Sequence, residues 1–321
     1  MMVFSDFTSI LSKNPNSRGE ILTQLKLVYD GKITKYTGTG GIPWEGKVGF
    51  LGASTPDVYT FLESSRSMGE RFLYYWMEQP TNAEVMLKQN GVKVSSKQIT
   101  AEMEQYYEEY YQQVGEFQSR HDVQLSMTDE QKLRINKAAE FCVNGKATIH
   151  TDFKTGKPDA IPSVSGVGRD SKIFDTLLHT LQLMQAYESD NPEITVSNRM
   201  IEIVEKCAYS SINRERRKIL EILVKATGPL TTSQIGASEG LGLEKEMIMK
   251  YLAPLHSIGM IKKKTHGTFA WYIDDPEVLA FVNRVAPTVV DKSPVAALEI
   301  DEEEPQESLL DEYFAQNKEG E

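Results

Sequence analysis

Short apolar segments alternate with an amphipathic helix near the N-terminus, and this alternation constrains the fold more than any other feature of the chain. Met1–Ser5 reads as the apolar end of a strand. Ser17–Tyr29 has apolar residues at helical spacing, and Lys47–Ser54 (KVGFLGAS) reads as a buried strand that ends at Thr55. Alternation of this kind predicts an α/β unit, which we place at residues 1–79.

A Gly-rich segment between these strands matches part of the sequence motif of a nucleotide-binding P-loop. Ile33–Tyr36 and the glycines after it predict a short hairpin that follows a turn at Asp30-Gly31. Gly41–Val48 (GIPWEGKV) then fits G-x-x-x-x-G-K, but a working P-loop follows a strand, opens a helix and ends in Ser or Thr. Because this segment precedes a strand and ends in Val, we predict a loop that leads into that strand. No other G-x-x-x-x-G-K-[ST] sequence occurs in the chain.

The next segment changes from strand to helix. Ser67–Trp76 (SMGERFLYYW) is expected to lead into another apolar strand, and residues 80–126 read as a helical connector with a turn near Asn90-Gly91. One helix of this connector carries four tyrosines on one side, namely Tyr106, Tyr107, Tyr110 and Tyr111. Such a stripe is typical of a packed helix face or of a platform that stacks nucleotides, and we favour the packed face.

Residues 127–212 read as a bundle of helices. Thr128 to Glu130 cap one helix, and Val196–Ser210 supplies another. Between them, a helix is predicted by an apolar stripe made of Ile173, Leu177, Leu181 and Met184. These patterns predict an all-α domain.

Residues 213–275 have the pattern of three helices followed by a hairpin. The helices are expected at Arg214–Ala226, Gln234–Ala237 and Leu243–Ile258. Two strands are expected at Met260–Lys264 and Phe269–Ile273. This order is the layout of a winged helix-turn-helix domain, in which the third helix reads DNA and the hairpin forms the wing.

The charge of this domain favours a nucleic-acid partner. Residues 213–273 carry ten Lys or Arg and five Asp or Glu, whereas the whole chain has a net charge of −11. The candidate DNA contacts are Lys245 and Lys250 on the third helix and Lys262, Lys263 and Lys264 on the wing. Winged helices also dock proteins, so protein docking stays an alternative to DNA binding.

Residues 286–321 form an acidic, Pro-containing tail that is expected to be disordered. An apolar island inside it carries Leu310, Tyr313 and Phe314. This spacing resembles the peptides with which replication proteins bind a sliding clamp, although Glu307 stands where such peptides usually have Gln. A sliding clamp is therefore a candidate partner.

The remaining composition favours a cytoplasmic location. No apolar run approaches the roughly 18 residues that a membrane helix needs, and the N-terminus has no signal-peptide pattern. Cys142 and Cys207 stand far apart without a CxxC motif, which is typical of buried, reduced thiols. The five histidines have no ligand spacing, so no metal site is expected.

The order of motifs resembles the AAA+ ATPases of replicative helicases, particularly the minichromosome-maintenance type and its phage and plasmid relatives. An apolar strand ends in Asp6, a later strand ends in Thr55-Pro56, and Arg71-Phe72 follows. Further along, Arg169 opens a helix like a sensor-2 residue, before helices like a lid and a winged helix. The resemblance covers residues 1–273 and implies a partial AAA+ core, a lid and a DNA-binding domain.

The resemblance also implies roles for four residues. Asp6 would be the Walker B acid that orients Mg²⁺, and Thr55 would be sensor 1. Arg71 would be an arginine finger that reaches a neighbouring subunit, and Arg169 would be sensor 2. Each has an ordinary alternative: a helix N-cap for Asp6, a turn residue for Thr55, and salt bridges for the two arginines, with Arg66 as a rival finger.

Two departures from the family pattern limit what this chain does alone. Phe7 stands where the family has the Glu that activates water, and the P-loop that precedes the Walker B strand is absent from the sequence. ATP and Mg²⁺ are thus expected only if another segment or polypeptide supplies the P-loop. We expect the C-terminal part of an ATP-dependent DNA helicase that works in an oligomer or with a complementing ATPase subunit. The alternative is a non-enzymatic winged-helix replication or transcription factor.

Overall fold

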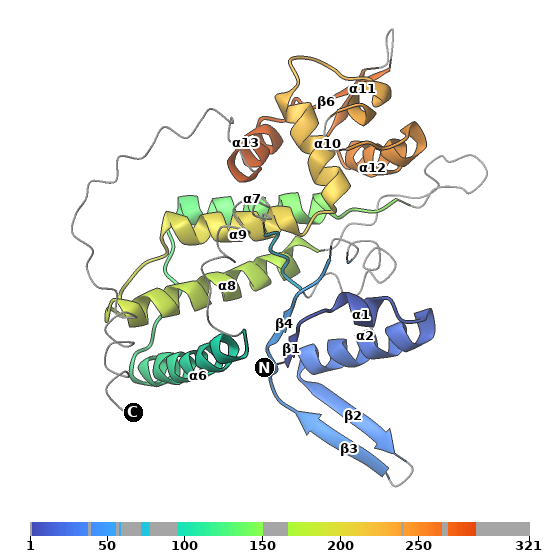
Figure 1. The fold of residues 1–321 in the computed structure, drawn as a ribbon. Helices are drawn as coiled ribbons and strands as arrows, with labels where there is room; N and C mark the ends of the chain where they lie inside the picture. The colour runs from blue at the N-terminus through green and yellow to red at the C-terminus, as the bar shows by residue number, and fades with distance from the viewer. Residues whose placement is uncertain are drawn as a thin grey trace. The chain divides into compact units, whose positions relative to one another are not determined.

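The computed structural model is a mixed α/β fold in which helices predominate and the sheets are small (Figure 1). Residues 1–286 belong to one compact unit. The structure describes residues 2–37, 40–55, 58, 72–77, 96–149, 166–238, 241–264 and 269–286. None of the described helices is long and apolar enough to cross a membrane.

The N-terminal elements pack around a small aromatic cluster. Strand β1 (Met2–Phe4) runs parallel to β4 (Phe50–Gly52), and helices α1 (Thr8–Leu11) and α2 (Pro15–Asp30) come between them in sequence. The rings of Phe4 and Phe50 stack 5.1 Å apart, and Phe7 packs edge-on against Phe50. The expected strand–helix–strand order is confirmed.

The expected buried strand at residues 47–54 is wrong in its extent and in its burial. The strand spans only Phe50–Gly52, and the side chains of Val3 and Leu51 are 62% and 59% exposed. Successive residues of a strand point to opposite faces, so the face of Phe4 and Phe50 is packed while the face of Val3 and Leu51 is open. Residues 72–77 belong to no strand, and the strand expected after Ser67–Trp76 would fall at residues 78–95, which lie outside the described residues.

A hairpin follows α2, as the sequence predicts. Gly31 takes the left-handed conformation, with φ at 90°, and ends the helix. Strands β2 (Lys32–Thr37) and β3 (Gly40–Glu45) pair antiparallel. Most of GIPWEGKV is therefore the second strand of the hairpin, and the expected loop is wrong. Pro43 is tolerated there because both strands of an isolated hairpin are edge strands.

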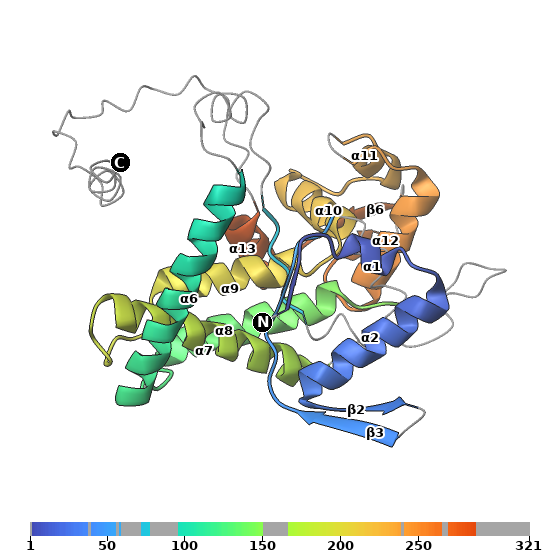
Figure 2. The same ribbon diagram turned by 60° about the horizontal axis from the view of Figure 1, so that its bottom comes forward.

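In the described residues that follow, the helices are α6 (Ser96–Arg120), α7 (Asp129–Gly145), α8 (Val167–Glu188) and α9 (Asn198–Ser210). Helix α7 contacts both α8 and α9, and α6 packs on α8 (Figures 1 and 2). Thr128 begins α7 with a capping box, in which Gln131 is its partner. The helices expected between residues 127 and 212 are present.

The apolar stripe of α8 is displaced by about one residue from the prediction. Its most buried apolar side chains are those of Phe174, Leu178 and Ala186, whereas Ile173 and Leu177 are only half-buried. The two half-buried residues line a cavity that they share with the N-terminal elements. Helix α8 thus has two apolar sides, so helical spacing alone does not show which of them faces the core.

Three helices and a hairpin then occur in the expected order. They are α10 (Arg214–Lys225), α11 (Thr232–Gly236), α12 (Lys245–Ser257), β5 (Lys262–Lys264) and β6 (Ala270–Tyr272). Trp271 joins them, because its backbone exchanges two hydrogen bonds with Leu230 and its Nε1 donates to Thr232 Oγ1 at 3.1 Å.

Helix α13 (Pro276–Val285) lies beyond the boundary at residue 275 and was not expected. Asp275 caps it, and Pro276 occupies its first turn. The helix packs on α9 and α10, and its Phe281 ring lies 4.1 Å from that of Phe141 on α7.

Candidate functional site

The ends of the two parallel strands carry a cluster of hydroxyl groups. Thr8 Oγ1 lies 3.2 Å from both Ser54 Oγ and Thr55 Oγ1, and it accepts a hydrogen bond from the Thr55 backbone at 3.0 Å. The backbone of Phe7 also donates to the carbonyl of Ala53, which holds the two strand ends together. The cluster thus fixes the position of Thr55 relative to β1.

Asp6 stands beside this cluster, two residues before the start of α1. Its Oδ1 accepts a hydrogen bond from the Thr8 backbone at 3.0 Å, and Ser9 Oγ donates to its carbonyl at 2.8 Å. This contact, two residues along the chain, is that of an Asx turn ahead of the helix; the N-cap position is Phe7, which makes no side-chain cap, so the expected N-cap role of Asp6 is not what the structure has. Its carboxylate is exposed.

An open cavity of about 750 Å³ lies between these strands and α8. Ser54 and Thr55 line it from the strand ends, and Arg169 and Lys172 line it from the first turns of α8. Two of the residues predicted for the site, Thr55 and Arg169, therefore line the same cavity. Asp6 is not among the residues that line it.

The electrostatics of this end of α8 favour an anion. Arg169 and Lys172 are exposed, and Gly166 begins the helix without a side-chain cap. The acid in the same turn, Asp170, is buried and forms an ion pair with Lys146 at 2.7 Å. Lys146 neutralises that carboxylate, and Arg169 and Lys172 place positive charge at the wall of the cavity.

Aromatic side chains form the apolar wall of the cavity. Phe72 packs against Phe50, with the ring centroids 4.9 Å apart, and Trp76 also lines the wall. The guanidinium of Arg217 lies 5.1 Å from the Trp76 ring, and so anchors this segment to α10. The cavity therefore offers aromatic rings to a planar apolar group and two cations to an anionic group.

Sequence reasoning missed three residues of this site. Lys172 stands one helical turn after Arg169, and that spacing could have identified it. Thr8 and Ser54 had no signal, because only the parallel pairing of β1 and β4 brings them together. Arg71 and its rival Arg66 lie outside the described residues, as do the proposed clamp contacts Leu310, Tyr313 and Phe314.

The five lysines predicted to contact DNA differ in their surroundings. Lys245, Lys250 and Lys264 are exposed. Lys262 forms an ion pair with Asp274 at 2.7 Å, and the ammonium of Lys263 lies 4.3 Å from the Phe269 ring. The first three lysines are therefore the better candidates for phosphate contacts.

Comparisons with models of known families, with curated proteins and with solved structures found no match. Within the described ranges, no group of three His, Cys, Asp or Glu residues is arranged to hold a metal ion.

Proposed function

We propose that the chain is the C-terminal portion of an AAA+ replicative-helicase-like ATPase. Residues 1–79 would be its partial core, residues 127–212 its lid, and residues 213–275 its DNA-binding winged helix. The P-loop would come from another polypeptide or from a segment outside these 321 residues, because the sequence contains none. The observation that carries the proposal is that Thr55 and Arg169 line one cavity with Lys172.

The cavity supports the proposal through the charge that it offers to a nucleotide. A triphosphate needs cations around its oxygens, and Arg169 and Lys172 of α8 line the cavity. Arg169 and Lys172 would offset the negative charge that builds up on the phosphates during hydrolysis. Thr55 would position water or the terminal phosphate, and its own position is fixed by Thr8.

The open sheet supports partner dependence. In the described residues, β1 and β4 pair only with each other, and one face of the pair exposes Val3 and Leu51. An unpaired edge and an uncovered apolar face are suited to strands from the polypeptide that carries the P-loop. The assembled ATPase would add the Arg71 finger from a neighbouring subunit.

The test has two stages. The chain alone should not bind ATP tightly in the presence of Mg²⁺, as measured by isothermal titration calorimetry. When it is co-expressed with a P-loop polypeptide encoded directly upstream, Arg169→Ala should lower ATP turnover by about 10²-fold. The matched control is Arg199→Ala, because Arg199 is 81% exposed on α9 and, among the described residues, pairs only with Glu202. Equal turnover in the two variants would remove Arg169 from the site.

The second candidate function is a non-enzymatic DNA-binding factor built around residues 213–275. The observation that favours it is the exposure of Lys245, Lys250 and Lys264 on α12 and the hairpin. It makes two predictions of its own: Arg169→Ala should leave DNA binding unaffected, and DNA binding should need no P-loop polypeptide.

A further inference from the structure

Three tyrosines on α6 lie in solvent, contrary to the expectation of a packed helix face. Tyr106 is 64% exposed, Tyr107 is 47% exposed and Tyr111 is 56% exposed. Only Tyr110 packs inward, where it contacts Tyr187 and donates to Glu188 at 3.0 Å. The helix is anchored to α8 on the Tyr110 side, so the other three rings form a separate surface.

The exposed rings are already ordered with respect to one another. Tyr107 and Tyr111 are stacked, with centroids 6.3 Å apart and an interplanar angle of 28°. Tyr106 stacks in the same way on Tyr110, at an angle of 17°. Rings that are held in place lose little conformational freedom when a ligand stacks on them, which favours binding.

Carboxylates share the face of the two stacked tyrosines. Glu104 is three residues before Tyr107, and Glu108 is three residues before Tyr111, so each acid lies beside a ring on the helix surface. Both acids are exposed. We call the surface of Glu104, Tyr107, Glu108 and Tyr111 the tyrosine–glutamate face.

The charge of α6 decides which ligand suits this face. The helix carries five glutamates against one lysine and one arginine, a formal charge of −3. A nucleic-acid backbone is repelled by such a helix, although its bases would stack on tyrosine. A guanidinium group instead stacks on the ring faces and pairs with the carboxylates at the same time.

We propose that the tyrosine–glutamate face of α6 docks an arginine-bearing segment of a partner protein. Cation–π contacts with Tyr107 and Tyr111 supply part of the affinity, and ion pairs with Glu104 and Glu108 supply the rest. The proposal stands apart from the cavity at α8 and holds with or without ATPase activity.

The experiment measures the fluorescence anisotropy of a labelled peptide of about six Arg-Gly repeats, titrated with the full chain. Tyr107→Leu/Tyr111→Leu should weaken binding about tenfold, because two exposed cation–π contacts are lost. The Phe pair at the same positions should bind like the parent, since its rings still stack. Glu104→Gln/Glu108→Gln should weaken binding and reduce its dependence on salt, while Glu116→Gln, on another side of the same exposed helix, should not.

Two further probes separate the proposal from its rivals. A Lys-Gly peptide of equal charge should bind more weakly than the Arg-Gly peptide, because an ammonium group cannot stack as a plane. A thymidine oligonucleotide should not compete. Equal binding by the Leu pair, equal affinity for the two peptides, or tyrosine-dependent binding of the oligonucleotide would each overturn the proposal.

Discussion

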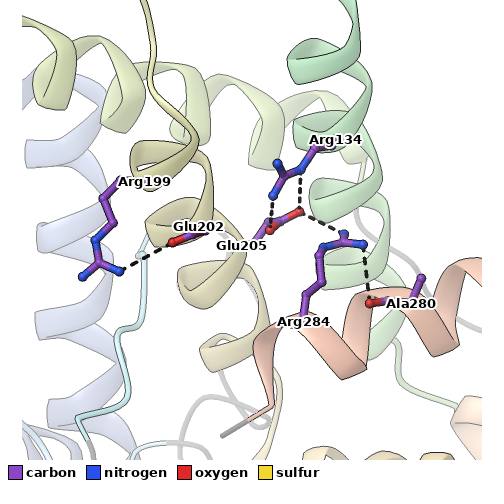
Figure 3. A network of polar contacts seen from close by, with 6 residues as sticks. All are labelled: Arg134, Arg199, Glu202, Glu205, Ala280 and Arg284. Atoms are coloured by element: carbon purple, nitrogen blue, oxygen red, sulfur yellow. Dashed lines mark hydrogen bonds and ion pairs between the residues drawn. The ribbon is translucent and has the colours of Figure 1, made fainter. Parts of the chain in front are cut away.

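Arg284 of α13 donates a hydrogen bond to Glu205 of α9 at 3.0 Å, although 79 residues separate them in sequence. Glu205 is almost fully buried, with 1% of its side chain exposed. Arg134 of α7 binds the same carboxylate with two hydrogen bonds, the shorter at 2.8 Å (Figure 3). One buried acid therefore joins α7, α9 and α13, and holds the helix that follows the DNA-binding candidate domain on the helical bundle.

We expect Arg134→Ala to lower the free energy of unfolding by about 2–4 kcal/mol, because it leaves the Glu205 carboxylate buried with one partner fewer. Urea unfolding followed by circular dichroism measures the change.

The matched control is Glu202, which lies on α9 one turn before Glu205. Glu202 pairs with Arg199, and both side chains are more than half exposed, so Glu202→Ala should cost at most about 1 kcal/mol. Similar losses for the two variants would mean that burial of Glu205 does not govern the strength of its pairs.

Gly145 allows the end of α7 to approach Ile212. A Cβ atom built at Gly145 would lie 2.2 Å from Ile212 Cδ1, which is far too close. Gly145→Ala should therefore destabilise the bundle by about 1–3 kcal/mol through overpacking, as measured by thermal unfolding.

Gly115 is the control for this substitution. It lies within α6, and a Cβ atom there would meet nothing within 4 Å. Gly115→Ala should stabilise the protein by about 0.5–1 kcal/mol, because alanine has the higher helix propensity. A stabilising Gly145→Ala would show that Ile212 moves aside freely.

The sequence predicted the helices well because their signals are local. The cap at Thr128, the left-handed Gly31 and the order of elements after Asn213 depend on residues close in the chain. Helix α13 also had local signals, since Asp275-Pro276 precedes apolar residues at helical spacing, but they fell beyond the boundary set at residue 275.

The site was only partly predictable, because it depends on contacts between distant segments. Arg169 was identified from its place at a helix start, but the pairing of β1 with β4 had to be known before Thr8 and Ser54 could be placed beside Thr55. The tyrosines of α6 illustrate the opposite error. Helical spacing gives the direction of a side chain and does not say whether another element covers it.

Alkaline pH should destabilise the protein through its two thiols. Burial raises the pKa of Cys142 to about 11, and burial also raises the pKa of Cys207 to about 11. In the unfolded chain a thiol has a pKa of about 8.5. The contribution of the two buried thiols to the free energy of unfolding is therefore complete below that pH and is lost as the pH rises through about 11.

The measurement is the free energy of unfolding at pH values from about 8 to about 11. The parent should lose a few kcal/mol over this range, and the variant Cys142→Ala/Cys207→Ala should lose less. In the native protein both thiols should resist Ellman's reagent until urea is added, because each is buried. Rapid native labelling would contradict their burial.

Salt dependence distinguishes DNA binding from protein docking at residues 213–275. Replacing Lys245, Lys250 and Lys264 with Ala removes three exposed cations. If all three contact phosphates, the plot of log K against log salt concentration should become less steep, by about 0.9 in slope for each lysine. Fluorescence anisotropy with a labelled duplex measures this slope.

Lys262 provides the contrast within the same hairpin, because its ammonium group is bound to Asp274 at 2.7 Å. A DNA phosphate must compete with that carboxylate, so Lys262→Ala should change the salt slope less than Lys264→Ala does. An unchanged slope in the triple variant would exclude these lysines as phosphate contacts and favour protein docking for this domain.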